Sequence, residues 1–346
     1  MERAKRQGKY RYYGAQGIID YIDDYIFDGE YLLLAEDGEN LKSNKQDLAQ
    51  LVEGKFWVNN HAHILRTKEV CRLRYFYYWI NNKNMAEYVT GSAQPKLSQA
   101  SLKKMIIPLP SLEVQDKILG VVTPIDDKIR ENERINENLS DQIQTIYSNE
   151  FDPTTHTPSG ILADICSYSS DRIPVSELSL STYYSTENMQ PNKMGSVDAT
   201  SLPSITQTTG CHKGDVLISN IRPYFKKIVY VTDNSCGCST DVLCFVPMED
   251  RYSAFLFGTL YMDRFFDYMV AGSKGTKMPR GDKQQIMNYP VVLPNKESLD
   301  LFNGLVVPML DQIASNRIEN SRLAALRDAL LPKLMSGELD VSDIDL

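Results

Sequence analysis

Basic, amide and aromatic side chains gather in two stretches of the second half of the chain, and their types suit contact with a nucleic acid. Arg can donate two hydrogen bonds to a guanine and Asn can pair in the same way with an adenine in the major groove, whereas Lys neutralises phosphates. We therefore expect DNA contacts from the members of these stretches that carry such groups, namely Asn220, Arg222, Tyr224, Lys226, Lys274, Lys277, Arg280 and Lys283.

A smaller set in the first half of the chain has the same chemical character. It consists of Asn59, Asn60, His61 and Lys96, which we also assign to DNA contact. An alternative for the first three is a turn whose polar side chains bond to their own backbone. Any one basic cluster can also be an ordinary solvated loop, and this includes a further cluster at Arg3, Lys5, Arg6, Lys9 and Arg11.

Catalytic or metal chemistry has weaker support in the sequence. His61 and His63 alternate along an apolar run and would lie on one face of a strand, but no third metal ligand is evident. A second candidate is a zinc site made of Cys211, His212, Cys236 and Cys238. The C-x-C spacing of Cys236 and Cys238 is unusual for zinc, which is typically bound by C-x₂₋₄-C. The sequence shows no phosphate-binding loop of the form GxxxxGKS or GxxxxGKT, no GxGxxG, and no NPP followed by Tyr or Phe. We therefore predict no catalytic residue and no metal site in this chain.

The elements that must position these side chains occur twice. The segment VTPIDDKI at 122–129 matches VVPMLDQI at 306–313, and this spacing of 184 residues continues without gaps along the following residues. Apolar segments bounded by proline, MIIPLP and YPVVLP, precede the two copies, and Gly91 to Lys96 parallels Gly272 to Lys277. We interpret the chain as a duplication in which each copy is a mixed segment followed by a long helix.

Both long helical segments carry the heptad pattern of a coiled coil. Apolar side chains and two asparagines recur at alternating steps of three and four residues, at Ile118, Val122, Ile125, Ile129, Asn132, Asn136 and Leu139, and again at Val306, Met309, Ile313, Asn316, Asn320 and Leu323. We predict that the two helices pair antiparallel and that the asparagines fix their register, with Arg327 interrupting the apolar pattern. The alternative is that each helix packs only on its own domain. About 37 helical residues would span roughly 55 Å, which suits a spacer.

The predicted fold class is α+β, with two tandem α/β domains separated by two long helices that form an antiparallel coiled coil. The predicted bounds are 1–110 and 158–294 for the mixed domains, 111–150 and 295–338 for the helices, 151–157 for a linker and 339–346 for a C-terminal tail. Projection by 184 residues places ILADIC, at 161–166, ahead of Met1. We therefore expect the first domain to be N-terminally shorter than the second by about 20 residues or more.

Length and composition narrow the class of protein. A chain of 346 residues with 42% hydrophobic and 24% charged residues is typical of a globular protein with two domains. No apolar run approaches the roughly 20 residues that cross a bilayer, and no signal peptide is evident, so we expect a cytoplasmic protein whose six cysteines stay reduced. Residues 111–152 carry 4 basic and 10 acidic residues, whereas 1–110 carry 16 and 13. The net charge of -8 therefore lies in the helices and does not exclude DNA as a partner of the domains.

Several segments resemble the specificity subunits of type I DNA restriction-modification systems. They cover nearly the whole chain together with the internal repeat, and they are YYGAQGIIDYIDDYIFDGEYLLLAEDG at 12–38, VNNHAHIL at 58–65, GDVLISNIRPYFKKI at 214–228, GTKMPRGDKQQIMNYPVVLP at 275–294 and ALRDALLPKLMSGELDVSDIDL at 325–346. The resemblance implies that each mixed domain is a target recognition domain that reads one half of a split double-stranded DNA sequence. It also implies that the helices dock methyltransferase (modification) subunits, two in each complex.

The same resemblance implies that this chain has no catalytic activity and no cofactor of its own. S-adenosylmethionine, ATP and Mg²⁺ would come with the modification subunits and with the restriction endonuclease and translocase subunits. Two alternatives stay open at this point. The chain could be a protein-binding coiled-coil adaptor, or a partly functional specificity subunit whose shorter first recognition domain does not read DNA.

Overall fold

The computed structural model describes residues 8–15, 17–38, 40–43, 47–91 and 95–341. The chain divides into two compact units, the first made of 1–130 with 320–346 and the second of 131–319. Arg3, Lys5 and Arg6 of the N-terminal basic cluster lie outside the described residues. None of the helices in the described part of the chain is both long and apolar enough to cross a membrane.

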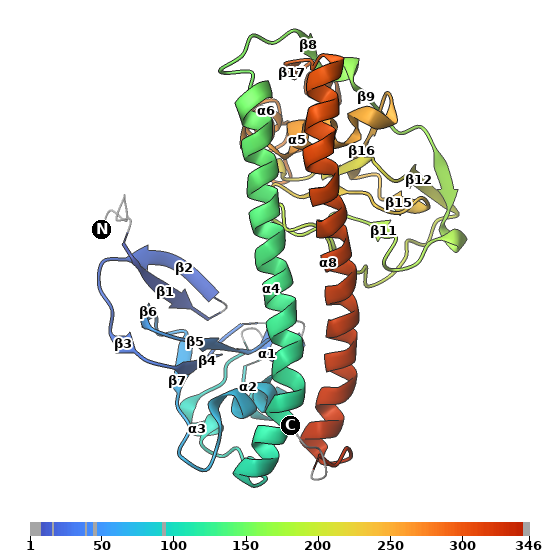
Figure 1. Ribbon diagram of the computed structural model, residues 1–346. Helices are drawn as coiled ribbons and strands as arrows, with labels where there is room; N and C mark the ends of the chain where they lie inside the picture. The colour runs from blue at the N-terminus through green and yellow to red at the C-terminus, as the bar shows by residue number, and fades with distance from the viewer. Residues whose placement is uncertain (1–7, 16, 39, 44–46, 92–94, 342–346) are drawn as a thin grey trace. The chain divides into compact units, whose positions relative to one another are not determined.

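The described strands of the first unit form two small sheets (Figure 1). One has the order β2-β1-β6-β3, with β1 and β6 parallel, and consists of β1 (Tyr10–Gly14), β2 (Gly17–Ile22), β3 (Phe27–Asp28) and β6 (Lys55–Val58). The other is the antiparallel sheet β5-β4-β7, made of β4 (Tyr31–Ala35), β5 (Ala49–Val52) and β7 (Ala62–Leu65). Strand β4 is a continuous apolar run because Leu32 and Leu34 face one core cluster while Leu33 faces another.

Helices cover the β5-β4-β7 sheet of the first unit. They are α1 (Asn40–Ser43), α2 (Leu73–Asn81), the 3₁₀ turn η1 (Ala86–Tyr88), α3 (Gln99–Leu102), the start of α4 (Leu112–Phe151) and the end of α8 (Lys296–Ser336). Helix α2 is amphipathic, and its buried Tyr75, Trp79 and Ile80 form one core with Val122 of α4 and Leu334 of α8. The ends of both long helices are thus part of the first unit's hydrophobic core.

The second unit repeats this plan with more strands. An antiparallel sheet has the order β14-β13-β16-β9 and consists of β9 (Cys166–Tyr168), β13 (Val216–Ser219), β14 (Ile228–Tyr230) and β16 (Val242–Pro247). A second sheet has the order β10-β12-β15-β11 and consists of β10 (Arg172–Pro174), β11 (Tyr183–Tyr184), β12 (Gln207–Cys211) and β15 (Cys236–Cys238). A short pair joins β8 (Gly160–Ile161) to β17 (Pro290–Val291).

Helix α5 (Ser253–Tyr261) lies at the centre of the second unit, and all nine of its residues are buried. The Phe255 ring contacts Phe302 of α8 and Tyr147 of α4, while the Phe257 ring contacts Tyr230 of the sheet. A Cβ atom at Gly258 would come within 2.8 Å of the Tyr147 ring, so this position lets the helices approach closely. Two further helices complete the unit, α6 (Asp263–Ala271) and α7 (Lys283–Met287).

The two long helices run antiparallel within each unit (Figure 1). Hydrogen-bonded pairs between the helices show this direction, because the residue number increases along α4 while that of its partner decreases along α8. The pairs are Asp126 with Arg327 and Ile129 with Asn320 in the first unit, and Asn132 with Glu319 and Asn136 with Asn316 in the second. Six predicted pairing residues are buried, namely Ile118, Val122, Asn132, Val306, Ile313 and Asn316. The other seven are half-buried, namely Ile125, Ile129, Asn136, Leu139, Met309, Asn320 and Leu323. The predicted α+β class with an antiparallel helix pair is confirmed.

The duplication is visible in the backbone hydrogen bonds. In the first unit the N–H of Gly38 donates to the carbonyl of Pro95 at 3.2 Å. In the second unit the N–H of Arg222 donates to the carbonyl of Pro279 at 2.8 Å, and each of these residues lies 184 positions after its counterpart. The same shift relates Leu97 and Glu36 to Gly281 and Asn220, and the Thr90–Lys96 bridge to the Lys274–Arg280 bridge. Lys96 therefore corresponds to Arg280, and the alignment of Gly91–Lys96 with Gly272–Lys277 was wrong by three residues.

Candidate nucleic-acid interface

Two segments that are far apart in the sequence meet at one edge of the second unit. The turn after β13 contacts the loop after α6, since Arg222 N–H donates to the carbonyl of Pro279 at 2.8 Å and Gly281 N–H donates to that of Asn220 at 3.3 Å. The loop itself is closed by two hydrogen bonds of 2.9 Å between Lys274 and Arg280. All eight residues predicted for DNA contact in this half of the chain lie on these two adjoining segments. We call them the paired loops, 220–227 and 272–283.

An unusual backbone sets the direction of the side chains in the first paired loop. Strand β13 ends at Ser219, and a single 3₁₀ turn at Pro223–Phe225 follows. Arg222 and Lys226 flank this turn in the left-handed region, with φ of 51° and 52°. Tyr224 and Phe225 are 48% and 38% exposed. The aromatic residues therefore protrude between two basic residues.

Three of the predicted cations form ion pairs with carboxylates. Lys226 Nζ lies 3.1 Å from Asp263, Lys274 Nζ lies 2.6 Å from Asp282, and a terminal guanidinium nitrogen of Arg280 lies 2.8 Å from Asp241. Hydrogen bonds from Lys274 and from the backbone of Gln285 lower the pKa of Asp282. Lys274 and Arg280 are 81% and 56% exposed, so their pairs are weak and can exchange a carboxylate for a phosphate.

The other predicted residues of the paired loops differ in their availability. Lys277 is exposed within the second loop, whereas Lys283 opens α7 with its Nζ 5.6 Å from the centre of the Tyr168 ring. Asn220 is only 9% exposed, and its Oδ1 is buried without a hydrogen-bond partner. That oxygen lies 2.9 Å from the position of a Cβ atom at Gly281. Asn220 would therefore have to turn outward to contact a base.

The structure adds Lys193, which the sequence interpretation missed. Its Nζ lies 2.6 Å from Asp263, the carboxylate that Lys226 also contacts, and its side chain is 10% exposed. Burial lowers the pKa of Lys193. Burial acts to raise the pKa of Asp263, but hydrogen bonds from the two lysines outweigh it and lower that pKa. The only signal in the sequence is the turn-like segment PNKMG at 191–195.

The predicted residues of the first unit meet at the corresponding edge. Asn59, Asn60 and His61 form the turn between β6 and β7, and the Asn59 Oδ1 accepts a 2.9 Å hydrogen bond from the His61 backbone. His61 Nδ1 lies 2.6 Å from Asp37, and Lys96 Nζ lies 3.0 Å from Glu36. The side-chain turn considered as an alternative is thus present at Asn59. This edge carries carboxylates at Glu36 and Asp37, where the second unit has Asn220 and Ile221.

The histidines and cysteines considered as metal ligands do not converge. His61 lies in the turn, not in a strand, whereas His63 lies in β7 with its Nε2 2.7 Å from the carbonyl of Leu97. His212 is exposed beside Asp171, whereas Cys211, Cys236 and Cys238 are buried in a separate core cluster. Burial raises the pKa of Cys236 to about 11. Among the described residues no three His, Cys, Asp or Glu side chains are grouped as a metal site.

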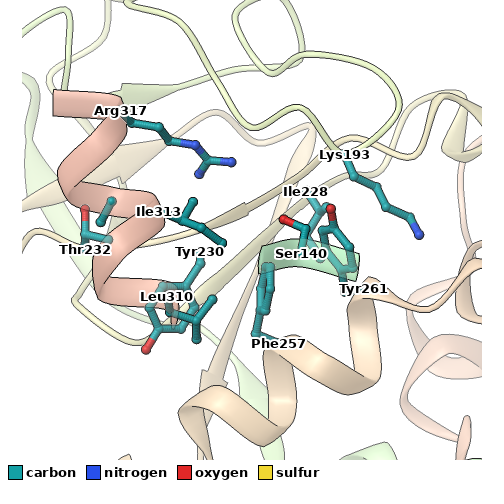
Figure 2. Close-up of a pocket in the computed structure, with 11 residues that line it drawn as sticks. Ser140, Lys193, Ile228, Tyr230, Thr232, Phe257, Tyr261, Leu310, Ile313 and Arg317 are labelled. Atoms are coloured by element: carbon teal, nitrogen blue, oxygen red, sulfur yellow. The ribbon is translucent and has the colours of Figure 1, made fainter. Parts of the chain in front are cut away.

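A small pocket lies in the second unit, and its lining includes Lys193 but none of the residues predicted for DNA contact (Figure 2). Arg317 extends into it from α8, opposite Tyr261 and Phe257 of α5 (Figure 2). Burial lowers the pKa of Arg317. Its lining combines hydroxyls, two cations and apolar groups, without a carboxylate, thiol or imidazole, and comprises Ser140, Lys193, Ile228, Tyr230, Thr232, Phe257, Tyr261, Leu310, Ile313, Ala314 and Arg317.

Comparison with known proteins gives consistent matches. Residues 2–141 match the family model of the type I restriction modification DNA specificity domain. The chain is similar to a putative type I restriction enzyme specificity subunit of Haemophilus influenzae, with 38% identity over 115 residues that span 33% of this chain but only 29% of that protein. It is also similar to the type I restriction enzyme MjaIX specificity subunit of Methanocaldococcus jannaschii, with 24% identity over 322 residues, 78% of this chain and 70% of that protein.

One solved structure has a comparable fold over nearly the whole chain. It is the S subunit of a type I restriction-modification system from M. genitalium, with a TM-score of 0.57 and 17% sequence identity. The similarity covers 96% of this chain and 91% of the other. At this identity the comparison supports the fold and not the individual contact residues.

Proposed function

We propose that the chain belongs to the family of type I restriction-modification specificity subunits, whose DNA specificity domain model matches residues 2–141. In this role it supplies DNA sequence recognition to such a complex and performs no catalytic step itself. Each unit reads one half of a bipartite double-stranded target. The observation that carries this proposal is the repeated edge, where two loops distant in sequence join through the same hydrogen bonds in both units. In the second unit this edge gathers arginine, lysine, asparagine and tyrosine, which are the groups that read bases and hold phosphates.

The partners follow from the same proposal. The long helices dock two modification subunits, and restriction subunits join through the complex. Exposed apolar side chains on α8 support a protein partner there, because burying apolar surface in an interface is favourable. These side chains include Leu301, Leu305, Ile318 and Leu326. S-adenosylmethionine, ATP and Mg²⁺ would be bound by these partners, all in the cytoplasm. The length of the helix pair would set the gap between the two half-sites.

The salt dependence of DNA binding tests the proposal. The experiment uses the full chain assembled with its modification subunit, and compares Lys277→Gln in the paired loops with Lys213→Gln. Lys213 is an exposed lysine of the same unit that precedes β13, at the opposite end from Asn220. If Lys277 contacts a phosphate, its loss lowers the slope of log affinity against log salt by about 0.9, and the control leaves the slope unchanged.

Two results would contradict the proposal. DNA affinity that does not depend on salt would favour the alternative of a protein-binding coiled-coil adaptor, because contacts with phosphates make affinity fall as the salt concentration rises. Equal slopes for both variants would mean that the paired loops do not carry the phosphate contacts.

A further inference from the structure

The first paired loop presents two aromatic rings to solvent at its tip. Tyr224 is 48% exposed and Phe225 is 38% exposed, and their ring centres are 4.7 Å apart. In the same unit the rings of Phe255, Phe265 and Phe266 are completely buried. Two adjacent exposed rings lose hydrophobic free energy unless something covers them. Their exposure therefore calls for an explanation that packing does not provide.

Neighbouring backbone holds this tip rigidly. The carbonyls of Phe225 and Lys226 accept hydrogen bonds of 2.8 and 2.9 Å from the N–H groups of Asn192 and Lys193. Pro223, which starts the 3₁₀ turn, is buried and fixes its own φ. The tip is thus bound on one side to the segment 192–193 and, through Arg222, on the other side to the second paired loop.

Backbone strain concentrates at the same place. Across the part of the chain that the structure describes, positive φ outside glycine occurs at four residues. Arg222 and Lys226 flank the tip, and Asn192 and Lys193 form the segment that donates hydrogen bonds to it. A left-handed conformation is unfavourable for lysine and arginine, because their Cβ atom comes too close to the following carbonyl oxygen. Strain of this kind persists where a particular geometry is needed for function.

The surroundings of the tip combine charge with further apolar surface. Met194 and Met278, in the two segments that contact the loop, are 64% and 49% exposed. The cations of the second paired loop lie on one of these segments, and Arg222 and Lys226 flank the tip itself. An apolar centre bordered by lysine and arginine matches a DNA duplex, in which stacked bases lie between rows of phosphates.

Building on the proposed function, we infer that Tyr224 and Phe225 form a wedge that inserts at one base step of the half-site read by the second unit and kinks the DNA there. The inserted rings replace part of the stacking that the separated bases lose, and the phosphates of the bent duplex reach the surrounding cations. A rigid tip loses little conformational freedom on insertion. The positions 184 residues earlier hold Asn40 and the buried Leu41, so the distortion is confined to one half-site.

Fluorescence of 2-aminopurine, which brightens when a base loses its stacking partner, tests this inference. The duplexes carry the mapped target with single adenines replaced in turn by 2-aminopurine, bound to the complete complex of the chain with its modification subunit. Wild type is compared with the double variant Tyr224→Ala/Phe225→Ala, with Tyr224→Phe, which keeps the ring, and with Lys277→Gln. Phe225→Leu, which keeps apolar bulk without a ring, replaces the double variant if that protein does not assemble.

We expect bright 2-aminopurine at one step of the second unit's half-site, lost in the variant without rings and retained in Tyr224→Phe and Lys277→Gln. Binding should weaken by about 10- to 100-fold without the rings, with an unchanged salt slope, because stacking and not charge is removed. Two results would overturn the wedge while leaving the proposed function intact. One is a 2-aminopurine signal as bright in the variant without rings as in wild type, and the other is no bright 2-aminopurine in a wild-type complex that binds its target. A wild-type complex without DNA affinity would instead contradict the proposed function.

Discussion

The ion pair between Arg327 and Asp126 links the two long helices in the first unit. A terminal guanidinium nitrogen of Arg327 on α8 lies 2.9 Å from Asp126 Oδ1 on α4. The other carboxylate oxygen accepts a 2.5 Å hydrogen bond from the Tyr78 hydroxyl. Arg327 is the residue that interrupts the heptad pattern, so its partner explains why a charge is tolerated there. We predict that Arg327→Met destabilises the protein although methionine suits the pattern better.

The magnitude follows from partial burial. The Arg327 and Asp126 side chains are 32% and 12% exposed, so the pair is neither a surface pair nor a buried one. Exposed pairs contribute at most about 1 kcal/mol, whereas breaking a buried pair costs about 3–5 kcal/mol. Because methionine keeps most of the aliphatic packing, the expected loss is about 2 kcal/mol in the free energy of unfolding, from a carboxylate left without its cation.

Urea denaturation of four proteins provides the assay: wild type, Asp126→Asn, Arg327→Met and the double variant. The double-mutant cycle should give a coupling energy of about 1–2 kcal/mol. Arg322→Met, at an exposed arginine of the same helix, is the control and should change stability by less than about 0.5 kcal/mol. A coupling energy near zero would refute the reasoning, because the apolar seam alone would then hold the helices.

Three further predictions concern the second unit. Gly281→Ala should lower stability by about 1–3 kcal/mol in thermal unfolding, because its Cβ would lie 2.9 Å from Asn220 Oδ1, and an unchanged melting temperature would show that the loop shifts freely. Phe255→Ala should cost about 3–5 kcal/mol in denaturant unfolding, because it leaves a cavity among the rings of α4, α5 and α8, and a loss below about 1 kcal/mol would contradict that packing. Two lysines lower the pKa of Asp263, so wild type should be more stable than Asp263→Asn, and the full difference should be present above about pH 4, which is the pKa of the carboxyl in the unfolded chain. The difference should decrease as the pH falls through the lower pKa of the folded state. A stability difference that does not change between about pH 2 and 6 would contradict this prediction.

The long helices could be read from the sequence because their pattern repeats over many turns. The predicted helices at 111–150 and 295–338 compare with the observed Leu112–Phe151 and Lys296–Ser336. Heptad spacing also indicated which side chains would face a partner. It did not reveal Tyr147 or Leu310, whose burial comes from contacts with the second unit's core and not from the pairing of two helices.

The candidate site was less accessible to sequence reasoning. Residue type singled out the two basic stretches, but their contact depends on hydrogen bonds between segments that the chain separates by about 50 residues, and no local pattern encodes such bonds. His61 and His63 were expected on one strand face, whereas the turn formed by Asn59 places His61 before the strand begins. The left-handed backbone at Arg222 and Lys226 was not foreseeable, because neither residue type favours that conformation.

The most direct test of the central claim is a methylation map. The chain is co-expressed with its modification subunit, and adenine methylation is located across the host genome by long-read sequencing. The account predicts one bipartite motif whose two halves are separated by a fixed gap. A complex that assembles yet leaves no methylation, or methylates a continuous motif without a gap, would contradict recognition by two separate units.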